Sequence, residues 1–302
     1  MNKAVILAAG KGTRMLSDKF KVLHTIGNQS MIGHLLDTLK QVHIDETCVV
    51  LAPDMEAVEK EIFPTPFVIQ KQALGTGNAV LAAKEMLSPF DGCCLVLFGD
   101  HPLFYPETFQ KMIDKYNAGT DVVVLGFTPK DNARYGRLIM GEDGLQAIVE
   151  FKDATEEQKA VRLCNSGAMC INGKYILELL KQIDNNNAAK EYYLTDIVKI
   201  ARQSGLKVDV EYAVDEYEVA GVNSRAEQAV AEEIFQNRMR DKALQNGVTL
   251  QDRNTTYFSY DTTFENDIII EPCVYFGPKV HIEKGAKIKA FSRLENTTVK
   301  GE

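Results

Sequence analysis

Short apolar runs alternate with amphipathic stretches along roughly the first 220 residues of the chain. The runs are rich in Val, Ile and Leu and are nearly continuous in apolarity, which is typical of strands covered on both faces. The stretches between them carry apolar residues at helical spacing. This alternation predicts an α/β domain whose mostly parallel sheet has helices on both faces. The expected strands are 4–9, 48–51, 67–70, 94–98 and 122–126, and the expected helices are 31–41, 55–62, 77–86 and 106–116.

The pattern changes after Asn223. Residues 225–240 form a polar stretch without Gly or Pro, which predicts one long helix. We therefore expect a first domain over residues 1–224 and a helical linker arm over residues 225–246.

A third pattern, with a period of six, covers the last 35 or so residues. A repeat of six is typical of a parallel β-helix, in which three hexads make one turn. The alternative is an ordinary β-hairpin region. The pattern continues to Glu302, so we expect a fragment of a longer protein, with too few turns to be stable alone. One series is Ile270, Phe276, Ile282, Ile288 and Leu294, and the second is Val274, Val280, Ala286, Ser292 and Thr298.

The composition narrows the classes of protein that fit. The net charge is -8, and there is no basic stripe that could neutralise the phosphates of a nucleic acid. No apolar run approaches the roughly 20 residues that span a bilayer, and the run at residues 4–9 is too short for a signal peptide. The six cysteines form no C-x-x-C pair and show no zinc spacing, so we expect reduced thiols in a cytoplasmic protein.

A glycine-rich string, Leu-Ala-Ala-Gly-Lys-Gly-Thr-Arg-Met at residues 7–15, directly follows the first predicted strand. In sheets of this kind ligands bind beyond the carboxyl ends of the strands. Gly10 and Gly12 let the backbone approach a phosphate and present N–H groups to it, and Arg14 can hold two phosphate oxygens at once. The spacing fits neither a Walker A loop nor a dinucleotide fingerprint.

This string resembles the signature of the nucleotidyltransferases that make nucleotide-sugars. More closely, the chain is similar to the uridyltransferase half of the bacterial bifunctional N-acetylglucosamine-1-phosphate uridyltransferase / glucosamine-1-phosphate acetyltransferase family (GlmU). The similarity runs over nearly the whole chain. It implies a Rossmann-like nucleotidyltransferase domain over residues 1–224 and the start of a left-handed β-helix of hexapeptide repeats over residues 247–302. It also implies that the chain joins UTP to N-acetylglucosamine 1-phosphate and releases pyrophosphate.

The resemblance also implies which residues meet the nucleotide. The signature loop is followed by a lysine before Val-Leu, here Lys21, although Phe20 replaces the usual proline and Lys19 leaves the register open. Gln70 and Gly75 would contact the uracil, since a glutamine can both donate and accept hydrogen bonds. Relatives often carry a second glutamine where this chain has Ala73. The implied catalytic residues are Arg14 and Lys21, and the implied nucleotide-binding residues are Leu7, Ala8, Ala9, Gly10, Gly12, Gln70, Gly75 and Thr76.

A magnesium site is expected at Phe98-Gly99-Asp100. Asp100 follows a predicted strand, and Mg²⁺ prefers one or two carboxylates together with substrate phosphates. The resemblance implies that Asn223, in Gly221-Val222-Asn223, is the second metal ligand. The alternative for Asn223 is a helix N-cap, and the residue could fill both roles.

Four further blocks carry the implied sugar site. They are Tyr135-Gly136-Arg137, residues 149–154, Asn165-Ser166-Gly167 and residues 191–196. The last block separates hexosamine enzymes from glucose enzymes. The implied sugar-binding residues are Gly136, Glu150, Lys152, Asn165, Tyr193 and Thr195.

The sugar phosphate is already ionised near neutral pH, so the expected reaction is in-line attack on the α-phosphorus of UTP without a general base. The alternatives are a glucose 1-phosphate uridylyl- or thymidylyltransferase and a non-catalytic scaffold. Acetyl transfer, which the family performs in later turns of the β-helix, is expected to be absent from this chain. The resemblance further implies a homotrimer that binds neither nucleic acid nor membrane.

Overall fold

The computed structural model describes residues 1–131 and 134–301. Contacts divide the described chain into two units. The first unit comprises Met1–Leu23 and Ile32–Gly221, and the second comprises His24–Met31 with Val222–Glu302. The first unit is therefore discontinuous in sequence.

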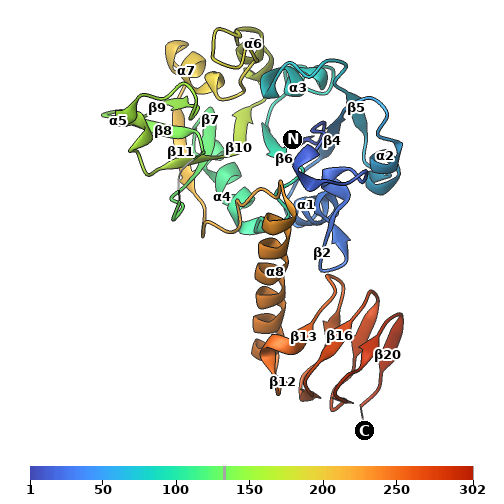
Figure 1. The fold of residues 1–302 in the computed structure, drawn as a ribbon. Helices are drawn as coiled ribbons and strands as arrows, with labels where there is room; N and C mark the ends of the chain where they lie inside the picture. Colours follow the sequence, from blue (N-terminus) through green and yellow to red (C-terminus); the bar gives the residue numbers. More distant parts are fainter. Residues whose placement is uncertain (132–133, 302) are drawn as a thin grey trace. The chain divides into compact units, whose positions relative to one another are not determined.

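The described part of the first unit is built on one nine-stranded sheet (Figure 1). The strand order is β11-β7-β10-β6-β1-β4-β5, and the hairpin β8–β9 joins through β10. The neighbours of β1 both run parallel to it, whereas β10 runs antiparallel to β6 and β7. The predicted α/β class with a mostly parallel sheet is thus confirmed. The strands are β1 Lys3–Leu7, β4 Glu46–Leu51, β5 Phe67–Ile69, β6 Cys93–Phe98, β7 Val122–Phe127, β8 Arg137–Gly141, β9 Gly144–Val149, β10 Cys164–Asn172 and β11 Val208–Tyr212.

Two apolar cores cover the two faces of this sheet. In β1, Val5 and Leu7 enter one core and Ala4 and Ile6 enter the other, because successive side chains of a strand point to opposite faces. Helices α3, α6 and α7 pack in the first core, and α1, α2 and α4 pack in the second. The helices are α1 Met31–Leu39, α2 Glu56–Ile62, α3 Thr76–Ala82, α4 Pro106–Asn117, α5 Glu156–Lys159, α6 Ile176–Lys181 and α7 Asp196–Gln203.

Some predicted strand and helix boundaries were wrong at the carboxyl edge of the sheet, where a ligand would bind. The first strand ends at Leu7, so Ala8 and Ala9 already belong to the following loop. Helix α3 begins at Thr76, directly after Gly75 with its φ of 112°, and it ends at Ala82, four residues before the predicted end. Three-residue 3-10 turns follow the glycine-rich loop, at Thr13–Met15 and Lys21–Leu23.

In the second unit, the predicted helix is present as α8, Arg225–Gln245. Its N-cap is Ser224, whose side chain accepts a hydrogen bond from the Glu227 N–H, so the capping role considered for Asn223 belongs to the next residue. The short hairpin β2 Thr25–Ile26 and β3 Gln29–Ser30 packs on this helix. A side chain at Gly27 would strike the ring of Phe235, which explains the glycine at the turn.

A parallel β-helix follows α8 (Figure 1), and it is held to the helix by buried polar side chains. Gln236 donates to the Phe258 carbonyl at 2.8 Å and accepts from the Phe258 N–H at 2.8 Å. Arg240, 5% exposed, donates to the Thr256 carbonyl at 2.8 Å. These side chains supply the hydrogen bonds that a neighbouring strand would otherwise provide.

The β-helix consists, within residues 248–299, of three sheets with three parallel strands each. Tyr257 pairs with Tyr275 and Tyr275 with Arg293, a repeat of 18 residues, which matches three hexads a turn. The strands are β12 Val248–Leu250, β13 Thr256–Tyr257, β14 Thr263–Phe264, β15 Ile268–Ile270, β16 Val274–Phe276, β17 Val280–Ile282, β18 Lys287–Ile288, β19 Arg293–Leu294 and β20 Thr297–Val299; the turn Arg253–Thr255 is 3-10.

The six-residue series holds through the middle of the β-helix. Phe276 and Ile282 of the first series and Val274 and Val280 of the second are buried. The second series predicted that Thr298 is buried, but Thr298 is exposed. The reason is the strand register: Val280 pairs with Thr297, so this turn is one residue shorter than the usual 18.

Five of the cysteines are buried free thiols, and Cys273 is exposed. Across residues 1–131 and 134–301, every helix is too short or too polar to cross a membrane.

Replacing Gln236 by alanine should lower the free energy of unfolding by about 2–4 kcal/mol, because the buried N–H and carbonyl of Phe258 both lose their partner. Chemical denaturation followed by circular dichroism measures this change. Gln245→Ala, at an exposed position of the same helix, is the matched control. Equal stability of the two variants would show that the Gln236 bonds do not hold the helix to the β-helix.

Candidate active site

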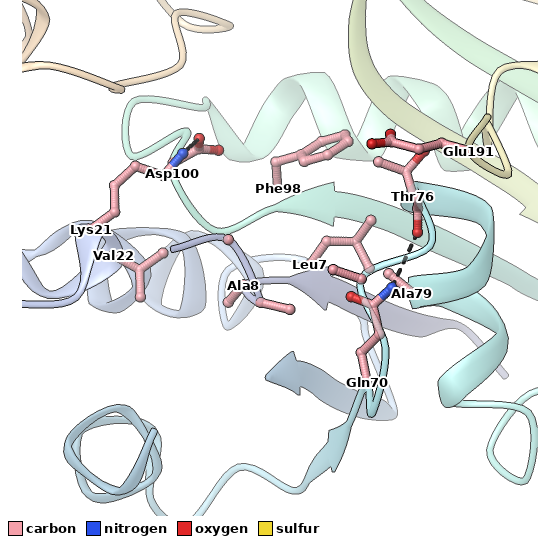
Figure 2. Close-up of a pocket in the computed structure, with 14 residues that line it drawn as sticks. Leu7, Ala8, Lys21, Val22, Gln70, Thr76, Ala79, Phe98, Asp100 and Glu191 are labelled. Atoms are coloured by element: carbon pink, nitrogen blue, oxygen red, sulfur yellow. Dashed lines mark hydrogen bonds and ion pairs between the residues drawn. The ribbon is translucent and has the colours of Figure 1, made fainter. Parts of the chain in front are cut away.

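A cavity opens beyond the carboxyl ends of β1, β5 and β6 in the first unit (Figure 2). This is the edge at which the sequence predicted the functional residues. The cavity is lined by residues from the glycine-rich loop, from the start of α3 and from the end of β6, as follows: Leu7, Ala8, Ala9, Gly10, Lys21, Val22, Gln70, Ala73, Gly75, Thr76, Ala79, Phe98, Asp100 and Glu191.

The glycine-rich loop borders one side of the cavity. A side chain at Gly10 would meet nothing within 4 Å, so this backbone is open to a ligand. Gly12, with a φ of 64°, lies against the Lys21 side chain, where a Cβ would not fit. Arg14 is exposed in its 3-10 turn and is not among the residues that line the cavity. The structure thus brings Leu7, Ala8, Ala9 and Gly10 to the cavity, whereas Gly12 and Arg14 are not among the residues that line it.

Lys21 and Asp100 form an ion pair at one end of the cavity (Figure 2). Their side chains are 13% and 14% exposed, so the pair is largely withdrawn from water. Burial by itself would raise the Asp100 pKa, but the charges of His101 and Lys21 outweigh it and the pKa is lowered. Burial lowers the pKa of His101, which favours its neutral form, and so we attribute the ionised state of Asp100 mainly to Lys21. Lys19, the other lysine considered, is exposed.

The chemistry of Asp100 fits a magnesium ion. Its carboxylate is kept ionised and follows β6 directly. Within residues 1–131 and 134–301, no group of three or more His, Cys, Asp or Glu side chains is placed to hold a metal ion. One carboxylate, with the remaining positions left to phosphate oxygens and water, is the arrangement that Mg²⁺ prefers. Asn223, the second predicted ligand, belongs to the second unit.

The opposite end of the cavity carries polar groups that suit a nucleobase. Gln70 is 8% exposed, and its Nε2 donates to the Gly75 carbonyl at 3.2 Å and to Asn78 Oδ1 at 3.0 Å. Figure 2 shows this amide beside Thr76 and Ala79, away from Lys21 and Asp100. The sequence suggested that Gln70 both donates to and accepts from a base, but its two amide hydrogens already have partners within the protein.

The block at residues 191–196 is fixed to the start of α3. A Cβ at Gly75 would lie 2.6 Å from the Tyr192 carbonyl oxygen, so only glycine allows this approach. The Leu194 N–H donates to Thr76 Oγ1 at 2.9 Å, and the Gly77 N–H donates to the Tyr192 carbonyl at 2.8 Å. The predicted base-binding and sugar-binding segments are therefore held together.

Four of the predicted sugar residues meet one another. Thr195 Oγ1 donates to Glu150 Oε1 at 3.2 Å, and a Cβ at Gly136 would lie 3.5 Å from both carboxylate oxygens of Glu150. The Asn165 N–H donates to the Gly136 carbonyl at 2.8 Å. Burial raises the Glu150 pKa despite the Thr195 hydrogen bond, and the nearby Asp153 and Asp196 raise it further.

An irregularity in β10 joins this group to the cavity. The register of β10 against β7 shifts between Asn165 and Met169, and such bulges often re-aim side chains beside active sites. Gly167, with a φ of 93°, packs against the ring of Phe98, which lines the cavity. The Gly167 N–H donates to Asn165 Oδ1 at 3.0 Å, so Asn165 is linked to the glycine that packs on Phe98.

Tyr193 and Lys152, the other two predicted sugar residues, lie in different surroundings. Tyr193 lines a second cavity together with Glu150 and Thr195. Lys152 is exposed and lines neither cavity.

Sequence reasoning did not assign site roles to five residues that line the first cavity: Val22, Ala73, Ala79, Phe98 and Glu191. Phe98 and Glu191 lay inside blocks that were recognised, so their positions in those blocks were the available signal. Val22 is the valine of the Val-Leu pair that placed Lys21, whereas Ala79 gave no signal.

Comparison with known proteins agrees with this architecture. The family of MobA-like NTP transferase domains matches residues 4–185. The chain is 47% identical over 297 residues to "Bifunctional protein GlmU" of Paramagnetospirillum magneticum, covering 98% of this chain and 66% of that protein. It is 49% identical over 267 residues to the protein of the same name from Rhodospirillum rubrum, covering 88% of this chain and 60% of that protein.

The protein of the same name from Zymomonas mobilis is 42% identical, with 98% of this chain and 67% of the relative covered. The chain thus spans about two thirds or somewhat less of the length of these relatives. Because the domain model matches more than half of the chain and these relatives are more than 40% identical to it, the chain belongs to the GlmU family of proteins with a MobA-like NTP transferase domain.

Proposed function

We propose that this chain transfers a uridylyl group from UTP to N-acetylglucosamine 1-phosphate, which gives UDP-N-acetylglucosamine and pyrophosphate. The observation that carries the proposal is the chemical division of one cavity (Figure 2). Lys21 and Asp100 provide charges at one end, and Gln70 and Gly75 provide polar groups for a base at the other. A nucleoside triphosphate has this same division.

The protein groups near the phosphates would act by positioning and by neutralising charge. The N–H groups of the loop at Gly10 and the Lys21 ammonium would bind the triphosphate oxygens, and Arg14 would approach from its exposed turn. The oxygen of the sugar phosphate is already ionised near neutral pH and attacks the α-phosphorus, while the bond to pyrophosphate breaks. No side chain has to remove a proton.

Asp100 is the residue of the first unit that would hold Mg²⁺, and the role of Asn223 as a second ligand remains a prediction from the resemblance. When bound, the ion would supply positive charge to the phosphate oxygens as a Lewis acid. Lys21 would then exchange its bond to Asp100 for one to phosphate.

The group formed by Gly136, Glu150, Asn165 and Thr195 supports the sugar half of the proposal. The Glu150 carboxylate can accept from sugar hydroxyl groups, and Gly136 leaves room for the ring beside it. Thr195 and Tyr193 are proposed to border the N-acetyl group. The homotrimer expected from the resemblance and the cytoplasmic location expected from the cysteines remain predictions.

Pyrophosphate release from UTP with Mg²⁺ should be fastest with N-acetylglucosamine 1-phosphate and much slower with glucosamine 1-phosphate or glucose 1-phosphate. A coupled phosphate assay on the purified chain measures this panel. Preference for glucose 1-phosphate would overturn the sugar assignment, and no release with any sugar or nucleotide would favour a scaffold.

Lys21→Ala should lower kcat about 100-fold or more, because one preorganised charge at the reacting phosphates is lost. Arg14→Ala and Asp100→Ala should have effects of similar size. Lys19→Ala is the matched control, since Lys19 is exposed and does not line the cavity. Near-normal turnover of Lys21→Ala, with a lowered rate for Lys19→Ala, would move the assignment to Lys19.

The KM for the sugar phosphate should rise as pH falls, and the rise should begin at a higher pH than an ordinary glutamate would give. The pKa of Glu150 is raised, so its carboxylate is protonated before those of exposed glutamates and then accepts fewer hydrogen bonds. Glu150→Gln should raise this KM at neutral pH and should show a smaller dependence on pH. If wild type and Glu150→Gln had the same pH profile, Glu150 would not contact the sugar.

A further inference from the structure

The orientation of the Gln70 amide is fixed by the protein. A side-chain amide has two N–H donors on one side and an acceptor oxygen on the other. A backbone carbonyl can only accept, so the bond of 3.2 Å to the Gly75 carbonyl has to come from Nε2. The second hydrogen of Nε2 points to Asn78 Oδ1 at 3.0 Å. If the amide were rotated by 180°, Gln70 Oε1 would face the Gly75 carbonyl oxygen and Asn78 Oδ1, and neither of these can donate a hydrogen bond.

The fixed amide presents one kind of group to the cavity. The Gln70 nitrogen donates to the Gly75 carbonyl, and Figure 2 shows this nitrogen turned toward Ala79 and the oxygen turned to the other side, below Leu7. Within residues 1–131 and 134–301, no protein group donates a hydrogen bond to this oxygen. No protein group in the same residues accepts a hydrogen bond from the Gly75 N–H. Gln70 and Gly75 both line the cavity, so the Gln70 oxygen and the Gly75 N–H are the acceptor and the donor that a base bound there would meet.

Uracil complements this pair of groups, because its N3–H donates and the carbonyl beside it accepts. Cytosine presents the reverse: its N3 accepts and its amino group donates. With cytosine in the same place, two acceptors and two donors would face each other, and partly buried groups without partners are costly.

We propose that Asn78 is the residue that positions Gln70 to select uracil over cytosine. This inference rests on the proposed function, since it concerns the base of the same nucleotide. Asn78 is half-buried in α3 and is not among the residues that line the cavity, so it acts through Gln70 without touching the base. Its oxygen holds the second amide hydrogen, which keeps the Gln70 oxygen toward the nucleotide.

The experiment compares kcat/KM for UTP and CTP in wild type and in Asn78→Ala, Asn78→Asp and Gln70→Ala. Asn78→Ala should lower the preference for UTP about fivefold to tenfold, the usual effect of one hydrogen bond. Asn78→Asp keeps an acceptor and should retain the preference. In a Gln70→Ala background, Asn78→Ala should have no further effect on the ratio, as a double-mutant cycle requires for a residue that acts through its neighbour. The matched control is Asn117→Ala, at the end of α4.

Binding of UMP and CMP, measured by calorimetry on the same variants, separates this inference from the proposed function. If wild type releases no pyrophosphate yet binds UMP better than CMP through Asn78, the proposed reaction fails and the inference stands. If wild type is active with UTP but Asn78→Ala keeps the full preference in rate and in binding, the inference fails and the reaction stands. A loss of preference that is equally large without Gln70 would also overturn it. Thermal melting of each variant identifies those that fail to fold, and Asn78→Ser is then the substitute.

Discussion

The double-sided hydrogen bonding of β1 is the constraint from which the cavity follows. This strand pairs in parallel with β4 on one side and with β6 on the other, so that Leu7 lies opposite both Val50 and Phe98. All five residues of β1 are buried, and the strand cannot slip by one residue without exchanging its two cores. Because these parallel strands end at the same level, the loops that follow them lie together at the carboxyl edge of the sheet. The glycine-rich loop and Asp100 therefore emerge side by side, although more than 80 residues separate them in the sequence.

Charge in the cavity is organised by the same arrangement. Taking a carboxylate and an ammonium out of water costs several kcal/mol for each ion, and a close partner offsets that cost. Lys21 and Asp100 provide each other with such a partner, and Gly12 is the residue that lets the loop pass close to Lys21. The pair concentrates positive and negative charge at one end of the cavity, whereas the other end offers the amides of Gln70 and Gly75 together with the Glu191 carboxylate. A nucleoside triphosphate could therefore place its phosphates at the charged end of the cavity and its base at the other end.

Much of this could be predicted from the sequence, and the failures have definite causes. The alternation of apolar runs with amphipathic stretches predicted the α/β class, the absence of Gly and Pro predicted the long helix, and the period of six predicted the β-helix. The resemblance and the positions after predicted strands pointed to Gln70, to Asp100 and to residues 7–10, which line the cavity, while their roles remain predictions. The hydrogen-bond state of Gln70 could not be predicted, since it depends on Asn78 and on the backbone of Gly75. The place of Arg14 outside the cavity depends on a turn without hydrophobic pattern. The period of six gave the wrong burial for Thr298 because the last turn is one residue shorter than the usual 18.

The hairpin at residues 24–31 gives the two units an unusual relation in sequence. It packs on α8, where the Gly27 N–H donates to Glu232 and the Tyr260 N–H donates to the Gly27 carbonyl. Yet it is inserted between Leu23 and Ile32, which both belong to the first unit. The molecule is consequently not modular in the usual sense. Recombination at one point of a gene could not transfer either unit complete, and a single protease cut near residue 221 would leave this hairpin on a fragment that lacks its partners.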